Sequence, residues 1–289
     1  MEQSVLIEIG LPAALFIIMA GMGMTLVPSD FYRVASSPKA LIWGSVAALL
    51  LLPIVGILLA MLLRLPPEIA VGLVIIAACP IGTTSNLISF LARGKLALSI
   101  AMTVVGSLAT IVTLPLFVNF ALERFVDADT RVYLPVLETI SMLVCIVLIP
   151  VLVGMFTRYK APALAARIER AVSVFGAVVL LTLIIGISVS VVDQWAKILT
   201  TAGPAVVALS ICGIVLGFLG SRLLGIYAVE AISVVVGMSV RNAAIGMLIA
   251  INMMNSPETA VPAALYGLLM YLFGFGLIGY GRMTIKSAV

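Results

Sequence analysis

Apolar residues run along the chain in long stretches that short polar segments separate. A helix that crosses a bilayer needs roughly 20 mainly apolar residues. By this criterion the pattern predicts nine membrane-spanning helices. Their approximate bounds are 5–27, 40–63, 69–92, 96–121, 132–156, 171–192, 198–220, 224–254 and 259–280. The predicted fold is an all-α integral membrane protein in which residues 1–289 form a single transmembrane transporter domain.

The order of these spans also predicts an inverted repeat. Spans one to four would correspond to spans six to nine, which leaves span five as an extra helix between the halves. Corresponding spans are five apart, so they cross the membrane in opposite directions, as in many secondary transporters. Repeat one would cover about 1–122 and repeat two about 171–289.

Composition supports a membrane protein and excludes a soluble one. Hydrophobic residues make up 63% of the chain and charged residues only 10%, whereas a soluble domain carries about a quarter charged residues. The first span is too long for the core of a cleavable signal peptide, and no basic cluster precedes it. The net charge of +4 is explained by membrane topology, so we expect a lipid bilayer and no nucleic acid as partner.

The distribution of basic residues predicts the orientation, because Lys and Arg favour cytoplasmic loops. With the N-terminus outside, the larger basic set falls on the inner side. It consists of Arg33, Lys39, Arg93, Lys95, Arg158, Lys160, Arg167, Arg170, Arg222, Arg282 and Lys286. The outer set is Arg64, Arg124, Arg131 and Lys197. We expect a multi-pass protein of the cell membrane with its C-terminus in the cytoplasm.

Two spans in corresponding positions contain residues that a lipid-facing helix avoids. Residues 79–86 read Cys-Pro-Ile-Gly-Thr-Thr-Ser-Asn, and residues 237–242 read Gly-Met-Ser-Val-Arg-Asn. Pro80 removes a backbone donor, and Gly82 relaxes the backbone further. Unwound backbone at this depth must be buried in protein or line a wet cavity. Freed carbonyls there can coordinate a cation, and half-helix N-termini favour an anion. A simple kink is the alternative for the first break, and the second break disfavours it.

Arg241 lies inside the eighth span, where an arginine costs a few kcal/mol or more. It would either bind the anionic group of a substrate or supply a fixed positive charge. The alternative is a structural ion pair with Glu138 or Glu230. The candidate substrate-binding residues are Thr83, Thr84, Arg241 and Asn242.

Several chemistries are excluded by what the chain lacks. It has no histidine, so a Ser–His dyad cannot form. Its three cysteines, Cys79, Cys145 and Cys212, are scattered through apolar runs and match no metal-binding spacing. We therefore expect no enzyme. A passive channel fits two broken helices less well than a carrier does.

A resemblance to a known family rests on several runs. These are 79–94 with 97–103, the Gly-Met-Gly-Met run at 21–24, and segments 37–40, 65–72 and 260–262. Together they resemble the bile acid:sodium symporter family in its nine-helix form. The resemblance implies a panel domain and a core domain in which the two broken helices cross. It also implies sodium-coupled uptake of organic anions such as bile acids, pantoate or other carboxylates.

In that family one sodium ion lies among residues that match Ser85, Asn86, Ser99 and Thr103, together with a Glu on the second broken helix. Alignment through Gly-Met puts Val235 at the Glu position, and alignment through Arg241-Asn242 puts Gly237 there. A further ligand, a Gln on an early helix, has no counterpart in the second span. We therefore expect Arg241 to replace the second sodium ion, or both, as a tethered charge.

The predicted function is a secondary active transporter that moves an organic anion across the membrane by alternating access. Sodium is the only candidate cofactor, and it would be coupled as one ion at most. The alternative is a sodium-independent or proton-coupled exporter of an organic anion. Glu138 and Glu230 are the least implausible carboxylates for carrying a proton.

Overall fold

The computed structural model describes residues 10–26, 37–127, 133–190 and 195–285, and these residues are almost entirely helical. In chain order, the first elements are α2 (Leu11–Thr25), α4 (Pro38–Val46), η3 (Ala47–Leu51), α5 (Leu52–Leu62), α6 (Pro67–Ala78), α7 (Thr84–Leu91) and α8 (Leu96–Phe125). Then follow α9 (Val136–Leu143), η4 (Val144–Leu148), α10 (Ile149–Lys160), α11 (Pro162–Ser190) and α12 (Trp195–Leu223). The chain ends with α13 (Ala228–Ser239), α14 (Ala243–Leu248), η6 (Ile249–Met253) and α15 (Pro257–Thr284).

The helices confirm the expected all-α membrane fold. Within the described residues, six uninterrupted helices are long and apolar enough to cross a bilayer. They correspond to the expected spans two, four, five, six, seven and nine. The described part of span one is α2, whereas spans three and eight are each divided into two shorter helices.

Two of the long spans widen into a π-helical turn just before a proline. The segment Ala47–Leu51 precedes Pro53, and Val144–Leu148 precedes Pro150. Proline cannot donate a backbone hydrogen bond, and a π turn shifts the bonding by one residue. At the first turn the Leu52 N–H donates to the Ala47 carbonyl. The Ala48 carbonyl would then need an N–H at position 53, where Pro53 has none.

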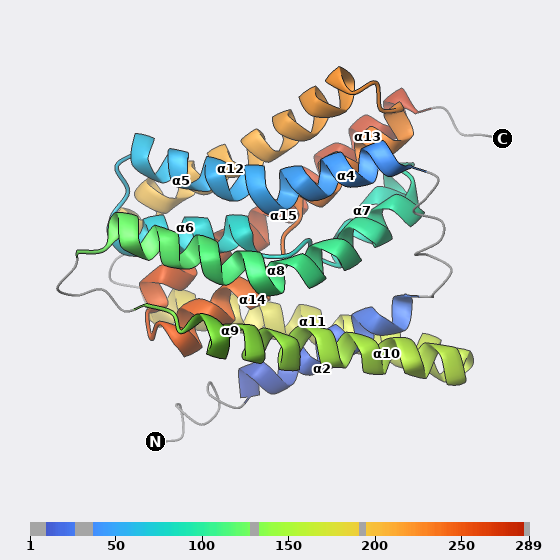
Figure 1. The fold of residues 1–289 in the computed structure, drawn as a ribbon, viewed down its shortest axis with the longest axis horizontal. Helices are drawn as coiled ribbons and strands as arrows, with labels where there is room; N and C mark the ends of the chain where they lie inside the picture. Colours follow the sequence, from blue (N-terminus) through green and yellow to red (C-terminus); the bar gives the residue numbers. More distant parts are fainter. Residues whose placement is uncertain (1–9, 27–36, 128–132, 191–194, 286–289) are drawn as a thin grey trace.

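The helices form two parts that lie one above the other in Figure 1. The smaller part, which we call the panel, consists of α2, the α9–η4–α10 span and α11, and these pack on one another. The larger part, the core, contains the remaining helices. Within the panel, a Cβ on Gly154 would lie only 2.0 Å from the Ala20 carbonyl, so α2 and α10 approach at backbone contact.

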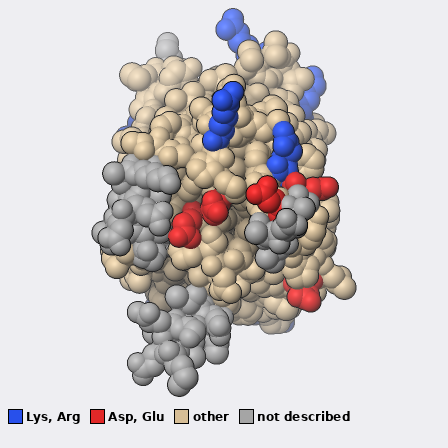
Figure 2. Space-filling model, turned by 90° about the vertical axis from the view of Figure 1, so that its left-hand side faces the viewer, with Lys and Arg blue, Asp and Glu red and all other residues tan. Residues whose placement is uncertain are grey.

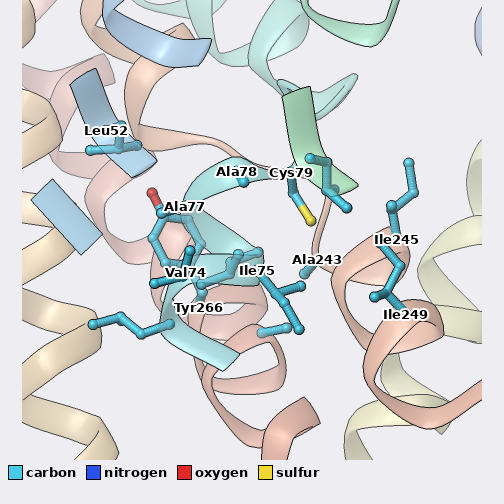
Figure 3. Packing of buried hydrophobic residues seen from close by; sticks show 14 of the residues in the cluster. Leu52, Val74, Ile75, Ala77, Ala78, Cys79, Ala243, Ile245, Ile249 and Tyr266 are labelled. Atoms are coloured by element: carbon cyan, nitrogen blue, oxygen red, sulfur yellow. The ribbon is translucent and has the colours of Figure 1, made fainter. Parts of the chain in front are cut away.

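The two half-helices α6 and α13 lie at the centre of the core. Every residue from Ile69 to Ala78 is buried, as is every residue from Ala231 to Ser239. A helix that is apolar all round is expected in such an interior position. Figure 3 shows residues of α6 between Tyr266 of α15 and the start of α14. The broken helices are therefore surrounded by protein, as unwound backbone within a bilayer requires.

The two ends of the molecule differ in charge. Figure 2 shows the end that carries the α5–α6 and α8–α9 connections, with acidic side chains gathered on it. The described acidic residues of this end are Glu68, Glu123, Asp127, Glu138 and Glu258. The opposite end carries the described basic residues Lys39, Arg93, Lys95, Arg158, Lys160, Arg167, Arg222 and Arg282. Of the other basic residues used for the orientation, Arg33, Arg131 and Lys286 lie outside the described residues, as do the side chains of Arg170 and Lys197.

Candidate functional site

The two breaks meet and are joined by main-chain hydrogen bonds. Ile81 and Arg241 form an antiparallel bridge, in which the Gly82 N–H donates to the Val240 carbonyl at 3.0 Å. The Asn242 N–H donates to the Pro80 carbonyl at 2.9 Å. A Cβ at Gly82 would lie 3.0 Å from the Arg241 carbonyl oxygen, so glycine permits this close approach. The backbone groups freed by one break thus satisfy those freed by the other.

The bridge defines which residues of the two breaks correspond. Both segments end in a polar residue followed by Asn, but these pairs occupy different positions. Ser85 and Asn86 lie in the first turn of α7, whereas Arg241 lies in the break itself and pairs with Ile81. The two pairs are alike in sequence but are therefore not equivalent in the structure.

Four oxygen-bearing side chains of α7 and α8 come together beside the crossing. The Ser99 hydroxyl donates to Asn86 Oδ1 at 2.8 Å, and the Thr103 hydroxyl lies 3.4 Å from the same oxygen. Ser85 Oγ is 3.4 Å from Thr103 Oγ1. Ser85, Ser99 and Thr103 are buried, and Asn86 is half-buried. The residues expected to hold sodium thus form one polar cluster, which we call the Asn86 cluster.

The Asn86 cluster suits a hard monovalent cation, because the atoms that could coordinate an ion are all oxygens. It supplies no negative charge. Val235, one candidate for the Glu position, is fully buried. The other, Gly237, faces the methyl group of Met102, which would lie 2.9 Å from an added Cβ. The described residues contain no group of three or more Asp, Glu or Cys side chains that could hold a metal ion. A cation here would bind only to neutral oxygens.

Arg241 is only 1% exposed, and its guanidinium is directed at backbone carbonyls. Nη1 donates to the Cys79 carbonyl at 3.2 Å, and Nη2 donates to the Ala48 carbonyl at 3.0 Å. The Tyr266 hydroxyl donates to the Ser239 carbonyl at 2.9 Å and lies close enough to interact with the guanidinium. In this conformation the guanidinium has no open surface on which a substrate anion could bind.

An ion pair of Arg241 with Glu138 or Glu230 is absent from the described residues. Glu230 instead lies in the first turn of α13, where its carboxylate pairs with Lys95 Nζ at 3.1 Å. The Ser37 hydroxyl donates to the same carboxylate oxygen at 2.5 Å. These three residues join the ends of α4, α8 and α13 at the basic end of the molecule.

The other three candidate substrate residues are half-buried around the crossing. Thr83 and Thr84 begin α7, and the Asn242 side chain caps α14 by accepting the Ile245 N–H at 3.3 Å. Tyr271 on α15 lies close enough to Thr84 for the two hydroxyl groups to interact. Three of the four candidates are thus accessible beside the two half-helix N-termini, whereas Arg241 is sealed within the core.

Sequence reasoning missed the roles of Tyr266, Tyr271 and the Ala48 carbonyl. The two tyrosines interrupt an otherwise apolar span, and a buried tyrosine hydroxyl usually finds a partner. That signal could have marked both of them. Nothing in the sequence at Ala48 signals the role of its carbonyl. Pro53, five residues later, could have indicated that a carbonyl in the preceding turn lacks a backbone donor.

Comparisons with known proteins agree with this architecture. A family model described as the Sodium Bile acid symporter family matches residues 12–198. The chain is 33% identical over 281 residues to the uncharacterized sodium-dependent transporter YocS of Bacillus subtilis (strain 168), covering 94% of this chain and 82% of that protein. It is 30% identical over 273 residues to the probable sodium/metabolite cotransporter BASS1, chloroplastic, of Arabidopsis thaliana. That match covers 93% of this chain and 66% of the plant protein's length.

The human sodium/bile acid cotransporter 4 is 33% identical over 158 residues, which are 55% of this chain and 36% of that protein. The names of these relatives describe transporters and not enzymes. The matched family and the crossing of two broken helices lead to the same conclusion: this chain is a multi-pass membrane protein that belongs to the sodium bile acid symporter family.

Proposed function

We propose that the chain is a secondary active transporter that moves an organic anion across the cell membrane by alternating access around the crossing. The observation that carries this proposal is the bridge between Ile81 and Arg241, which brings two half-helix N-termini together inside the core. Unwound backbone at such a crossing is the usual location of substrate and ion sites in transporters built from inverted repeats.

The substrate site would include the N-terminal turn of α7. Thr83 and Thr84 are half-buried there, and Asn242 and Tyr271 lie on neighbouring elements. Hydroxyl and amide donors combined with the positive end of a helix favour a carboxylate. The substrate class is therefore an organic anion, such as a bile acid, pantoate or a similar carboxylate.

Unequal contacts between panel and core support alternating access. At the acidic end, Leu11 and Leu15 of α2 join Ile146, Ala244 and Leu248 in one buried cluster. At the basic end, α10 packs extensively only on α2, α11 and η4 among the described elements, and α7 packs only on core helices. These unequal contacts support the proposal that the crossing is closed toward the acidic end and reached from the basic end in this conformation.

Ion coupling would involve the Asn86 cluster and at most one sodium ion. The family description and the relatives' names refer to sodium. To hold sodium here, the hydroxyls of Ser99 and Thr103 would turn their hydrogens away from Asn86 so that their oxygens face the ion. The missing carboxylate would make this binding weak, because neutral oxygens alone must replace the ion's water.

The second candidate is a sodium-independent or proton-coupled exporter of an organic anion. The observation that favours sodium independence is the buried guanidinium of Arg241, which already places a cation at the crossing. Proton coupling has less support, because Glu230 is paired with Lys95.

The test is uptake of labelled taurocholate, pantoate and related carboxylates into proteoliposomes, with an inward sodium gradient or with potassium in its place. We expect saturable uptake and counterflow for at least one anion. Thr84→Val should weaken its apparent affinity about tenfold, the effect of losing one or two hydrogen bonds. Asn86→Ala should abolish any sodium stimulation.

Ser89→Ala is the matched control, since Ser89 is a buried serine on the same helix whose hydroxyl has no partner among the described residues. It should behave as the wild type. Non-saturable flux without counterflow would contradict a carrier. Sodium stimulation that survives Asn86→Ala would exclude the Asn86 cluster as the coupling site.

A further inference from the structure

Two prolines leave two carbonyl groups without backbone donors near the middle of the core. The Ala48 carbonyl lacks a donor because Leu52 donates to Ala47 and Pro53 has no N–H. The Cys79 carbonyl lies beyond the last residue of α6, where Pro80 ends the helix. These carbonyls belong to different spans, and both accept a hydrogen bond from one arginine.

The surroundings of the two carbonyls favour positive charge. The Cys79 carbonyl is at the C-terminal end of α6, which is the negative end of that helix dipole. Cys79, Ala48 and Arg241 are each at most 1% exposed, so the dipoles act with little solvent screening. No described carboxylate forms a salt bridge with Arg241, so the carbonyls themselves stabilise the guanidinium.

We propose that the Ala48 and Cys79 carbonyls form a site for a monovalent cation and that the guanidinium of Arg241 is its permanent occupant. We call this site the carbonyl cradle. Its occupant is part of the chain, so the bound positive charge cannot leave during transport. If the chain is the proposed transporter, the cradle supplies a positive charge at the crossing without coupling transport to an ion gradient. Only this consequence rests on the proposed function. Removing the guanidinium should open the cradle to a free ion such as sodium.

The charge of Arg241 also explains why a second free cation is not expected beside it. Two unit charges a few ångströms apart repel by several kcal/mol at the effective dielectric of a protein site. The guanidinium of Arg241 therefore competes with a free sodium ion for the same two carbonyl oxygens. The side chain has the advantage that it is covalently attached.

The test is thermal unfolding of the full chain in detergent, with sodium, potassium, guanidinium or choline chloride at equal ionic strength. All variants carry Asn86→Ala, so that sodium binding at the Asn86 cluster does not contribute. With Arg241 intact we expect no difference between sodium and choline. With Arg241→Ala we expect a lower Tm in choline that sodium or guanidinium partly restores. At an ion concentration ten times the dissociation constant, the rise should be about 3 °C.

Arg241→Lys keeps a tethered charge and should show no ion dependence. Arg93→Ala is the matched control, because Arg93 also donates to two carbonyls, those of Arg282 and Ile285, but at the exposed end of the core. It should gain no cation response. If Arg241→Ala does not fold, Arg241→Gln is measured in its place, since its amide can still donate to one carbonyl.

A folded Arg241→Ala or Arg241→Gln variant whose Tm is the same in sodium, potassium, guanidinium and choline would overturn the proposal. A cation response of equal size in Arg241→Lys would also overturn it. The measurement does not use transport, so a failure to find an organic anion substrate would not contradict the proposed cation site. Conversely, a result that contradicts the cation site would not contradict the proposed transport function.

Discussion

Carbonyl groups freed at the crossing are paired with side chains from other helices, whereas Arg241 Nε has no hydrogen-bond partner among the described residues. The guanidinium of Arg241 reaches carbonyls of two spans, and the Tyr266 hydroxyl reaches the carbonyl of Ser239 at the end of α13, in a third span. An unpaired carbonyl in a dry interior costs about 1–3 kcal/mol. These two side chains therefore stabilise breaks that lipid alone would not tolerate.

Glu230 provides a prediction about proton coupling. Glu230→Gln should keep transport and its pH dependence, because the carboxylate has a structural role with Lys95 and Ser37. The variant should lose less than about 1 kcal/mol of stability, since the Lys95 side chain is 32% exposed and solvent screens the pair. Uptake across a pH series and thermal unfolding would check this. Transport lost in Glu230→Gln but kept in Glu230→Asp would instead indicate that the carboxylate carries protons.

Close helix contacts in the panel depend on glycine. The run at 21–24 contributes Gly23, whose added Cβ would lie 2.2 Å from the Val151 carbonyl, and α10 contributes Gly154 in return. Small residues let helices approach within a membrane, where van der Waals packing replaces the hydrophobic effect. The panel is thus held by backbone-to-backbone packing of α2 and α10.

Gly154→Ala should therefore destabilise the protein by about 1–3 kcal/mol, the usual range for overpacking. The added methyl group would meet the Ala20 carbonyl at 2.0 Å, so the two helices must separate. Gly276→Ala on α15 is the control, because nothing lies within 4 Å of that position. Tm values measured in the same detergent would decide, and equal values for the two variants would contradict the prediction.

The asymmetry of charge over the whole molecule predicts its orientation. If the basic end is cytoplasmic, a cysteine at Arg158 should react with an impermeant maleimide only after the cells are opened. A cysteine at Arg64 should react in intact cells. Both substitutions are made after Cys145 and Cys212 are changed to Ser, and Cys79 is buried. The reverse pattern of labelling would show that the N-terminus is inside.

The contact between panel and core predicts how the transport cycle can be stopped. Leu15 and Leu248 belong to one buried cluster between the panel and the core. A cleavable cross-link between Leu15→Cys and Leu248→Cys should abolish counterflow, and reduction should restore it, because the two parts must separate there to change access. A cross-link within the panel, between Ile18→Cys and Gly176→Cys, should leave counterflow intact. Equal activity of the two cross-linked proteins would argue against a moving panel.

The chain's own pattern was sufficient to predict the spans, the two breaks and the family. Apolar length, Pro80 and Gly82 are local signals, and the physics of a bilayer gives them one meaning. The joining of Ser85, Asn86, Ser99 and Thr103 also followed from the resemblance, and the helix spacing of Ser99 and Thr103 agrees with it.

Only the tertiary structure decided what Arg241 contacts. Its sequence neighbours suggested a substrate ligand or an ion pair, but its partners are carbonyls 162 and 193 residues away. The same holds for the pairing of Ile81 with Arg241 and for the buried contact of α2 with η4 and α14. These contacts join groups distant in sequence, and hydrogen-bond direction and helix packing fix them only once all the spans are assembled.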